Sequence, residues 1–158
     1  MNIRSATAED AEIMLALIIE LAIYEKAEHE VLTTADEIRT SMFGSNSKAS
    51  ALIAEVDNKP VGYAVYFYNY STWLGKNGIY LEDIYVSPDY RQQGIGKALL
   101  QNVANIAVTN DCGRVEWSVL DWNTQAIDFY QSLGAKPQDE WTVYRLSGDE
   151  LTRFAAKN

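Results

Sequence analysis

The sequence predicts a single α/β domain with a mixed β-sheet, and three observations support this prediction. Two apolar runs, 51–56 and 61–70, flank the turn-forming Asp57-Asn58-Lys59-Pro60, which is typical of an antiparallel hairpin. A third run, 79–86, precedes a glycine-bearing loop, an amphipathic helix and another strand-like run at 114–120, which is the order of a β-α-β crossover. A length of 158 residues fits one domain, 1–158, with antiparallel hairpins first and the crossover after them.

Capping and turn signals predict the other elements. Thr7-Ala8-Glu9-Asp10 is a near capping box, and Thr34 stands at the start of a second amphipathic stretch. Gly44 and Gly134 follow helical patterns at positions typical of helix ends. The remaining expected elements are a strand at 3–6, helices over about 7–25, 35–43, 94–110, 124–133 and 149–156, and a late strand over 141–146.

Composition narrows the classes of function. The formal net charge is −9, which argues against nucleic acid and anionic membrane surfaces as main partners. No apolar stretch is long enough for a membrane span, and the N-terminus lacks a signal-peptide core, so we expect a cytoplasmic protein. Cys112 is the only cysteine, which excludes an internal disulfide and a cysteine-based zinc site, and we expect no metal.

The loop from Arg91 to Lys97 has the pattern Arg-x-x-Gly-x-Gly between a strand and a helix. It fits neither common nucleotide fingerprint, because Ala98 follows Lys97 and Leu99 stands where a dinucleotide loop needs a small residue. Glycines leave backbone amides uncovered at the positive end of a helix dipole, where a pyrophosphate is stabilised. Taken alone, the pattern fits an anion site or a plain glycine turn equally well.

Longer blocks resemble a known family. Leu81-Glu82-Asp83-Ile84-Tyr85-Val86, followed by Tyr90-Arg91-Gln92-Gln93-Gly94-Ile95-Gly96, resembles the acetyl-CoA motif of the GNAT N-acetyltransferases. The blocks at 20–26, 73–76, 80–83 and 122–130 resemble the diamine (spermidine/spermine-type) acetyltransferase branch, so the similarity covers nearly the whole chain. The resemblance implies the GNAT acyl-CoA N-acyltransferase fold, a mixed twisted sheet with a splayed central strand pair flanked by helices.

The resemblance also implies acetyl-CoA as the cosubstrate. Backbone groups of the central strand would pair with pantetheine, and amides of the glycine loop would hold the pyrophosphate. The start of the helix after 121–123 would line the far side of CoA. The residues carried over as cofactor-binding are Ile84, Tyr85, Val86, Arg91, Gln92, Gln93, Gly94, Ile95, Gly96, Lys97, Asn123 and Ala126.

The implied reaction is direct attack of a primary amine on an acetyl thioester. An alkylammonium with a pKa of about 10.4 must first lose a proton, and the departing thiolate must be protonated or stabilised. The family places a general acid where this chain has Tyr130, and Glu82 is our choice for proton removal, through water. Glu82 and Asp83 point to opposite sides of a regular strand, so both face the amine only if the strand carries the bulge known in this family.

Acids and aromatic faces around the strand would hold the cationic amine, with cation–π contacts of roughly 0.5–2 kcal/mol. Polyamine-type members carry an aspartate two residues before the loop tryptophan, where this chain has Ser71. The missing acid favours a shorter amine, and the branch that prefers thialysine-type amino acids becomes the competing interpretation. The expected substrate-binding residues are Tyr24, Glu25, Trp73, Glu82, Asp83, Glu116, Trp117 and Ser118.

The sequence is compatible with two further alternatives. One is acetylation of a protein or peptide amine, and the other is a non-catalytic acyl-CoA-binding module. The presence of both Tyr130 and Glu82 speaks against the second, because a sensor needs neither. The family commonly forms homodimers through late strands, and we expect a homodimer in which the aromatic segment 141–144 serves that purpose.

Overall fold

The computed structural model describes residues 1–156 and divides the chain into two compact units, Met1–Leu120 and Asp121–Asn158. The expectation of one domain over 1–158 stays a prediction. None of the helices in the described part of the chain is both long and apolar enough to cross a membrane.

The first unit contains a five-stranded mixed sheet, which confirms the predicted fold class. The sheet has the order β1-β2-β3-β4-β5, with antiparallel pairing from β1 to β4 and parallel pairing between β4 and β5. The parallel pair is joined by a helical crossover, as the sequence predicts. The strands are β1 (Asn2–Ser5), β2 (Ser50–Val56), β3 (Lys59–Ser71), β4 (Lys76–Val86) and β5 (Val115–Trp117).

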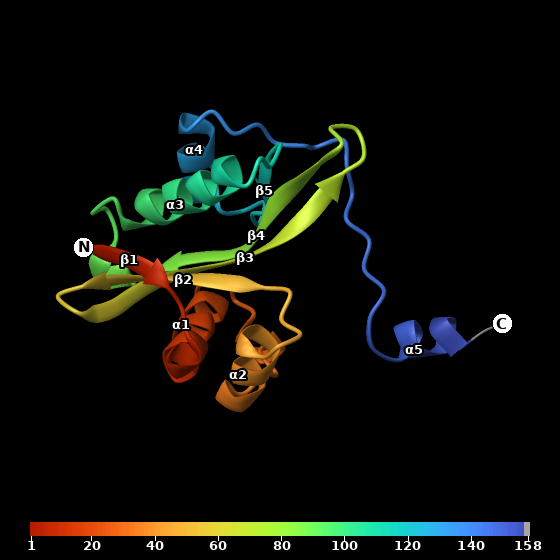
Figure 1. The fold of residues 1–158 in the computed structure, drawn as a ribbon, viewed down its shortest axis with the longest axis horizontal. Coiled ribbons are helices and arrows are strands. Elements are labelled where there is room, and N and C mark those ends of the chain that lie inside the picture. Colours follow the sequence, from red (N-terminus) through yellow and green to blue (C-terminus); the bar gives the residue numbers. More distant parts are fainter. Residues whose placement is uncertain (157–158) are drawn as a thin grey trace. The chain divides into compact units, whose positions relative to one another are not determined.

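Helices cover both faces of this sheet. On one side lie α1 (Ala11–Tyr24) and α2 (Ala35–Phe43), and on the other lies α3 (Ile95–Thr109) (Figure 1). The α1 side holds a core of Met14 and Leu17 against buried side chains of β2, β3 and β4, including Tyr63 and Tyr85. The opposite side buries Leu99 and Val103 of α3. Two apolar layers therefore fix the central strands in place.

Local signals explain the element boundaries. Asp57 and Asn58 have φ values of 50° and 62°, and Val56 pairs directly with Lys59, so the hairpin closes through a two-residue turn. The predicted helix start at Thr34 is confirmed, and it forms a capping box in which the Thr34 hydroxyl accepts from the Glu37 amide at 3.2 Å. The β3–β4 connection is shorter than the gap between the predicted strands over 61–70 and 79–86, because cross-strand pairing continues to Ser71 and Lys76.

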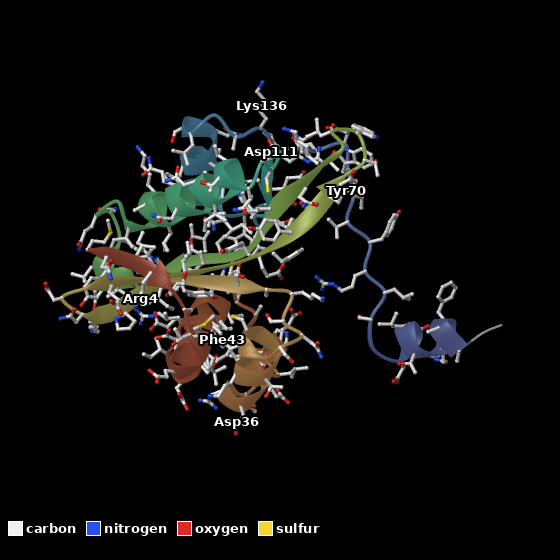
Figure 2. The ribbon with its side chains drawn as sticks, in the orientation of Figure 1. Arg4, Asp36, Phe43, Tyr70, Asp111 and Lys136 are labelled. Carbon is white, nitrogen blue, oxygen red and sulfur yellow. The ribbon has the colours of Figure 1, made fainter. Side chains whose placement is uncertain are left out.

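An ion pair anchors the start of α1 to the sheet. The Arg4 guanidinium on β1, labelled in Figure 2, donates to Asp10 at 2.8 Å and bridges to Glu55 of β2 at 2.9 Å. Asp10 is only 5% exposed and also accepts from the Thr7 amide at 2.7 Å. The Asp10 carboxylate therefore ties the start of α1 to β1, and Arg4 extends the contact to β2.

The second unit contains α4 (Thr124–Ser132), an extended segment and α5 (Gly148–Ala156). Gly134 has a φ of 92° just after α4, as expected of a C-terminal glycine cap. The predicted late strand over 141–146 is wrong for the described residues, which form no strand there. Its alternating side chains have strand propensity, but a strand forms only when a neighbouring strand takes up its backbone hydrogen bonds. Val143 and Tyr144 are instead 83% and 94% exposed.

Candidate active site

A bulge on β4 interrupts the sheet at the two acids. Val65 pairs with Asp83, whereas the next residue along β3, Tyr66, pairs with Leu81, so Glu82 is the extra residue. The bulge confirms the geometry on which the sequence-based assignment of both acids depended. Because Asp83 pairs with Val65, its side chain belongs to the α1 face of the sheet together with Tyr63 and Tyr85.

Asp83 has a polar partner within this apolar face. The Tyr63 hydroxyl donates to Asp83 Oδ2 at 2.9 Å, and Tyr63 itself is fully buried. Burial raises the pKa of Asp83, the hydrogen bond from Tyr63 opposes that rise, and the neighbouring Glu82 carboxylate adds to it. Glu25, directly after α1, also has a raised pKa, first because of burial and then because of repulsion by Asp83. Two carboxyl groups from distant parts of the sequence therefore share one partly buried site.

Glu82 differs from Asp83 in its surroundings, because its side chain is exposed. An exposed carboxylate beside the bulge is accessible to water, as the water-mediated role in the sequence-based assignment requires. Asp83, the next residue on β4, is the carboxyl group that the fold removes from water.

The strand residues next to the acids add aromatic and polar groups to the same face. The rings of Phe67 and Tyr80 lie 5.3 Å apart, and the Tyr80 hydroxyl is 2.7 Å from Ser118 Oγ. The register between β4 and β5 places Glu116 beside Tyr80, and Glu116 pairs with Arg114 at 3.1 Å. Tyr80 was not among the expected site residues, although it begins the block Tyr80-Leu81-Glu82-Asp83 that carries the family resemblance.

Two expected substrate-binding residues lie elsewhere in the first unit. Trp117 pairs with Leu81, which places it on the face of the sheet opposite Asp83. Trp73 lies in the β3–β4 turn and is 82% exposed. This turn is built around Ser71, which is buried and whose hydroxyl accepts from the Leu74 amide at 3.1 Å. Figure 2 labels Asp111, which binds Lys76 beside the same hairpin at 2.9 Å.

The parallel strands β4 and β5 pair over only three residues. Their register ends at Leu81 opposite Trp117, whereas β4 continues to Val86 and stays paired with β3 as far as Gly62. The edge of β4 over 84–86 therefore has no β5 partner, as a splayed central pair requires. Backbone groups on this edge are available to an extended ligand, apart from the Val86 carbonyl, which accepts from Arg91 Nε.

The loop after β4 presents an open helix N-terminus. Gln92 and Gly94 have φ values of 63° and 80°, and Gly94 is the residue that precedes α3. A helix leaves its first amides without intrahelical partners, and glycine has no side chain to cap them. A Cβ added at Gly94 would meet no atom within 4 Å, and the first turn of α3 holds no acid. The amides around Ile95 to Lys97 thus fit a pyrophosphate.

Arg91 braces the loop against α1. Its Nε donates to the Val86 carbonyl at 3.0 Å, and its guanidinium lies 4.9 Å from the ring centre of Tyr24 and 5.3 Å from that of Tyr85. These residues line a groove of about 700 Å³ beside α1. The groove brings Tyr24, expected to bind the amine, next to Tyr85 and Arg91, expected to bind the cofactor.

The second unit carries the remaining expected residues on α4. Asn123 caps the helix, because its Oδ1 accepts from the Ala126 amide at 3.3 Å. Tyr130 lies two turns along α4, so Asn123, Ala126 and Tyr130 follow one helical face. Within residues 1–156, no group of three or more His, Cys, Asp or Glu side chains is placed to hold a metal ion.

A mixed sheet that opens beside a bare helix N-terminus, with acids on an adjacent bulge, defines the class of acyl-CoA-dependent N-acyltransferases. Residues 17–135 match the model of the Acetyltransferase (GNAT) family. The chain belongs to this family, whose members use acetyl-CoA as acetyl donor, and its relatives at 38–40% identity are named N-acetyltransferases.

Three similar proteins illustrate the relationship. The thialysine N-epsilon-acetyltransferase of Bos taurus is 40% identical over 166 residues, which cover 98% of this chain and 97% of that protein. The spermidine/spermine N(1)-acetyltransferase-like protein 1 of Homo sapiens is 37% identical over 98% of this chain and 24% of its own length. The solved structure of an integron cassette protein from the V. cholerae mobile metagenome has a TM-score of 0.83 and 26% identity, covering 99% of this chain and 98% of its own.

Proposed function

We propose that the protein transfers the acetyl group of acetyl-CoA to the primary amine of a small cationic substrate, either a polyamine, a diamine or a lysine-like amine. The observation that supports this substrate class is the partly buried acid pair of Asp83 and Glu25 on the α1 face. Repulsion by the Asp83 carboxylate raises the pKa of Glu25, and a bound ammonium group relieves that repulsion. The site therefore favours a cation over a neutral or anionic substrate.

The assigned roles follow the chemistry of direct attack. Acetyl-CoA supplies the acetyl thioester. The amine loses a proton, through water, to Glu82, and its nitrogen forms the new C–N bond as the C–S bond breaks. Tyr130 donates a proton or a hydrogen bond to the departing sulfur. Gly94, Ile95, Gly96 and Lys97, with Arg91, Gln92 and Gln93, form the phosphate-binding loop in this proposal. Ile84, Tyr85 and Val86 offer the open strand edge, and Asn123 and Ala126 line CoA.

The second candidate is acetylation of a thialysine-type amino acid. Ser71 stands where polyamine-type members carry an acid, and its hydroxyl is used to hold the turn by accepting from Leu74. Without an acid at position 71, the site has one carboxylate fewer to bind the ammonium groups of a long polycation. The full-length similarity to a thialysine acetyltransferase supports the same choice. The remaining candidate is a protein or peptide amine.

The test is release of CoA measured over a panel of amines. Putrescine, spermidine, thialysine, lysine and a lysine-containing peptide are compared at equal concentration, with acetyl-CoA saturating. We expect the highest kcat/KM for a short amine, with thialysine and putrescine above spermidine. Preference for spermidine would favour the polyamine assignment. Binding of acetyl-CoA without turnover of any amine would leave only the acyl-CoA-binding module.

We also propose a homodimer formed through the segment over 141–146. The large side chains of Trp141, Val143 and Tyr144 are 65%, 83% and 94% exposed. Proteins seldom expose a contiguous series of apolar side chains to solvent unless it forms an interaction surface. β5 is an edge strand of the described sheet, so a second copy offers this segment a place to pair. Light scattering is expected to give the mass of two chains, and Val143→Asp is expected to reduce it to one. A monomeric wild-type protein would contradict this assembly.

We further propose that no metal ion takes part, because direct attack by the amine needs only proton transfers. We place the reaction in the cytoplasm, in line with the sequence-based expectation. Dialysis of the protein against a chelator, followed by the CoA-release assay, is expected to leave the rate unchanged.

A further inference from the structure

Tyr63 contacts the acid pair but lies outside every set of residues that the sequence assigned to the site. It stands in the middle of β3, is fully buried, and donates its hydroxyl hydrogen to Asp83 Oδ2 at 2.9 Å. We propose that Tyr63 is a positioning residue for amine recognition, which holds the Asp83 carboxylate in the orientation and charge that an ammonium group requires. This inference rests on the proposed function.

The geometry explains why Tyr63 reaches Asp83. Residue 63 pairs with Tyr85 and residue 65 with Asp83, so Tyr63 and Asp83 are diagonal neighbours on one face of the β3–β4 ladder. The bulge at Glu82 places Asp83 on this face, since the residue after a bulge is shifted by one position relative to a regular strand. A carboxylate offers about four acceptor positions, so one hydrogen bond from Tyr63 leaves the others available to a ligand.

The surroundings of Asp83 make the Tyr63 hydroxyl important for keeping this carboxyl group charged. Burial, the Tyr63 hydroxyl and the Glu82 carboxylate act on the pKa of Asp83, and burial and Asp83 act on that of Glu25, so within residues 1–156 no cation contributes to either shift. Burial and the Glu82 carboxylate raise the pKa of Asp83, and the Tyr63 hydrogen bond is the effect that favours the charged form. The ionisable groups around this site are Tyr63 on β3, Glu25 after α1, Glu82 and Tyr85 on β4, and Arg91, which stacks on Tyr85.

Loss of the Tyr63 hydroxyl therefore shifts the pKa of Asp83 in a defined direction. Without the donor, the pKa of Asp83 rises further, so the carboxyl group stays protonated up to a higher pH. A neutral Asp83 binds an ammonium group weakly, whereas the amine itself stays protonated until about pH 10. The defect is thus largest at acidic pH and diminishes as the pH rises and Asp83 ionises.

The test compares Tyr63→Phe with a matched control, Tyr66→Phe. Both residues are buried tyrosines of β3, but the Tyr66 hydroxyl interacts with Ser50 and lies on the opposite face of the sheet. CoA release is measured with thialysine and putrescine between about pH 6 and 9, because a higher pKa of Asp83 lowers its charged fraction most at the acidic end of the series. The midpoint of the Asp83 carboxyl titration is measured in parallel by carbon NMR, and melting temperatures report on folding.

We expect Tyr63→Phe to raise the KM for the amine by about tenfold at about pH 6, the size typical of a lost hydrogen bond to a charged group. The increase should fall to within about twofold at pH 9, with the KM for acetyl-CoA unchanged and the Asp83 midpoint shifted upward. Tyr66→Phe should change none of these. An unchanged Asp83 midpoint, or a KM increase equal at every pH, would overturn the role of Tyr63. Absence of turnover by the wild-type enzyme on any amine would instead overturn the proposed function.

Discussion

Replacement of Asp83 by asparagine tests the acid pair directly. Asparagine keeps the size of the side chain and still offers an oxygen to the Tyr63 hydroxyl, so the packing around the 2.9 Å hydrogen bond is preserved and only the charge is lost. A carboxylate and an ammonium about 4 Å apart attract by about 4 kcal/mol at the effective dielectric constant of a protein surface. Desolvation takes part of that energy, and hydrogen bonds to charged groups contribute about 1.5–3 kcal/mol net.

That energy corresponds to a loss of about 10- to 100-fold in kcat/KM for the amine, since about 1.4 kcal/mol is a factor of ten. The assay is CoA release at a fixed pH near 7.5, with acetyl-CoA saturating and the amine varied. Asp57→Asn is the matched control, because it removes one negative charge at an exposed turn where asparagine tolerates the observed φ of 50°. A loss smaller than about threefold, or an equal loss in the control, would refute amine binding by Asp83.

Three further substitutions test other parts of the site and the fold. Tyr130→Phe is expected to lower kcat by at least about tenfold with little change in acetyl-CoA affinity, measured by calorimetry, and an unaltered kcat would remove the role of the hydroxyl. Glu82→Gln should reduce kcat/KM most at low pH, where the amine is more fully protonated, whereas a loss that is equal across a pH series would indicate positioning instead of proton removal. Asp10→Asn should lower the free energy of unfolding by about 2 kcal/mol, because a buried carboxylate loses its charge-assisted bonds to Arg4. The hydrogen bond with Arg4 lowers the pKa of Asp10, so the stabilisation by the Asp10 carboxylate is present above the pKa of the unfolded state and is lost as the pH falls. Chemical denaturation at a series of pH values should therefore show a weaker acid dependence of the unfolding free energy for the variant than for the wild type.

Most of the fold was predictable because its signals are local. The turn residues Asp57 and Asn58, the capping threonine at 34 and the glycine after α4 each act through neighbours a few positions away. The order of hairpin strands and crossover then fixed the mixed sheet. The late strand over 141–146 failed for the opposite reason. Alternating side chains indicate a propensity for strand structure. Whether a partner strand lies beside them depends on the tertiary structure, which the local sequence does not give.

The candidate site was predictable only in part. The family resemblance named Glu25, Glu82 and Asp83, but the contact between Tyr63 and Asp83 joins residues twenty positions apart in sequence. It depends on a register that the bulge shifts by one residue, and a run of tyrosines on β3 gives no sign of which one meets a carboxylate. The position of Trp117, on the face away from Asp83, likewise required the β4–β5 register.

Two irregularities of β4 fall at adjacent positions, and together they shape the candidate site in the first unit. The parallel ladder with β5 ends at Leu81, and the bulge inserts Glu82 directly after it. The first irregularity opens a strand edge that a pantetheine-like chain can use, and the second brings Asp83 onto the α1 face beside Tyr63. A regular strand would provide neither, because continued pairing would close the edge and the unshifted register would turn Asp83 to the other face. In the proposed reaction, the same short stretch of backbone therefore sets where the thioester and the amine meet.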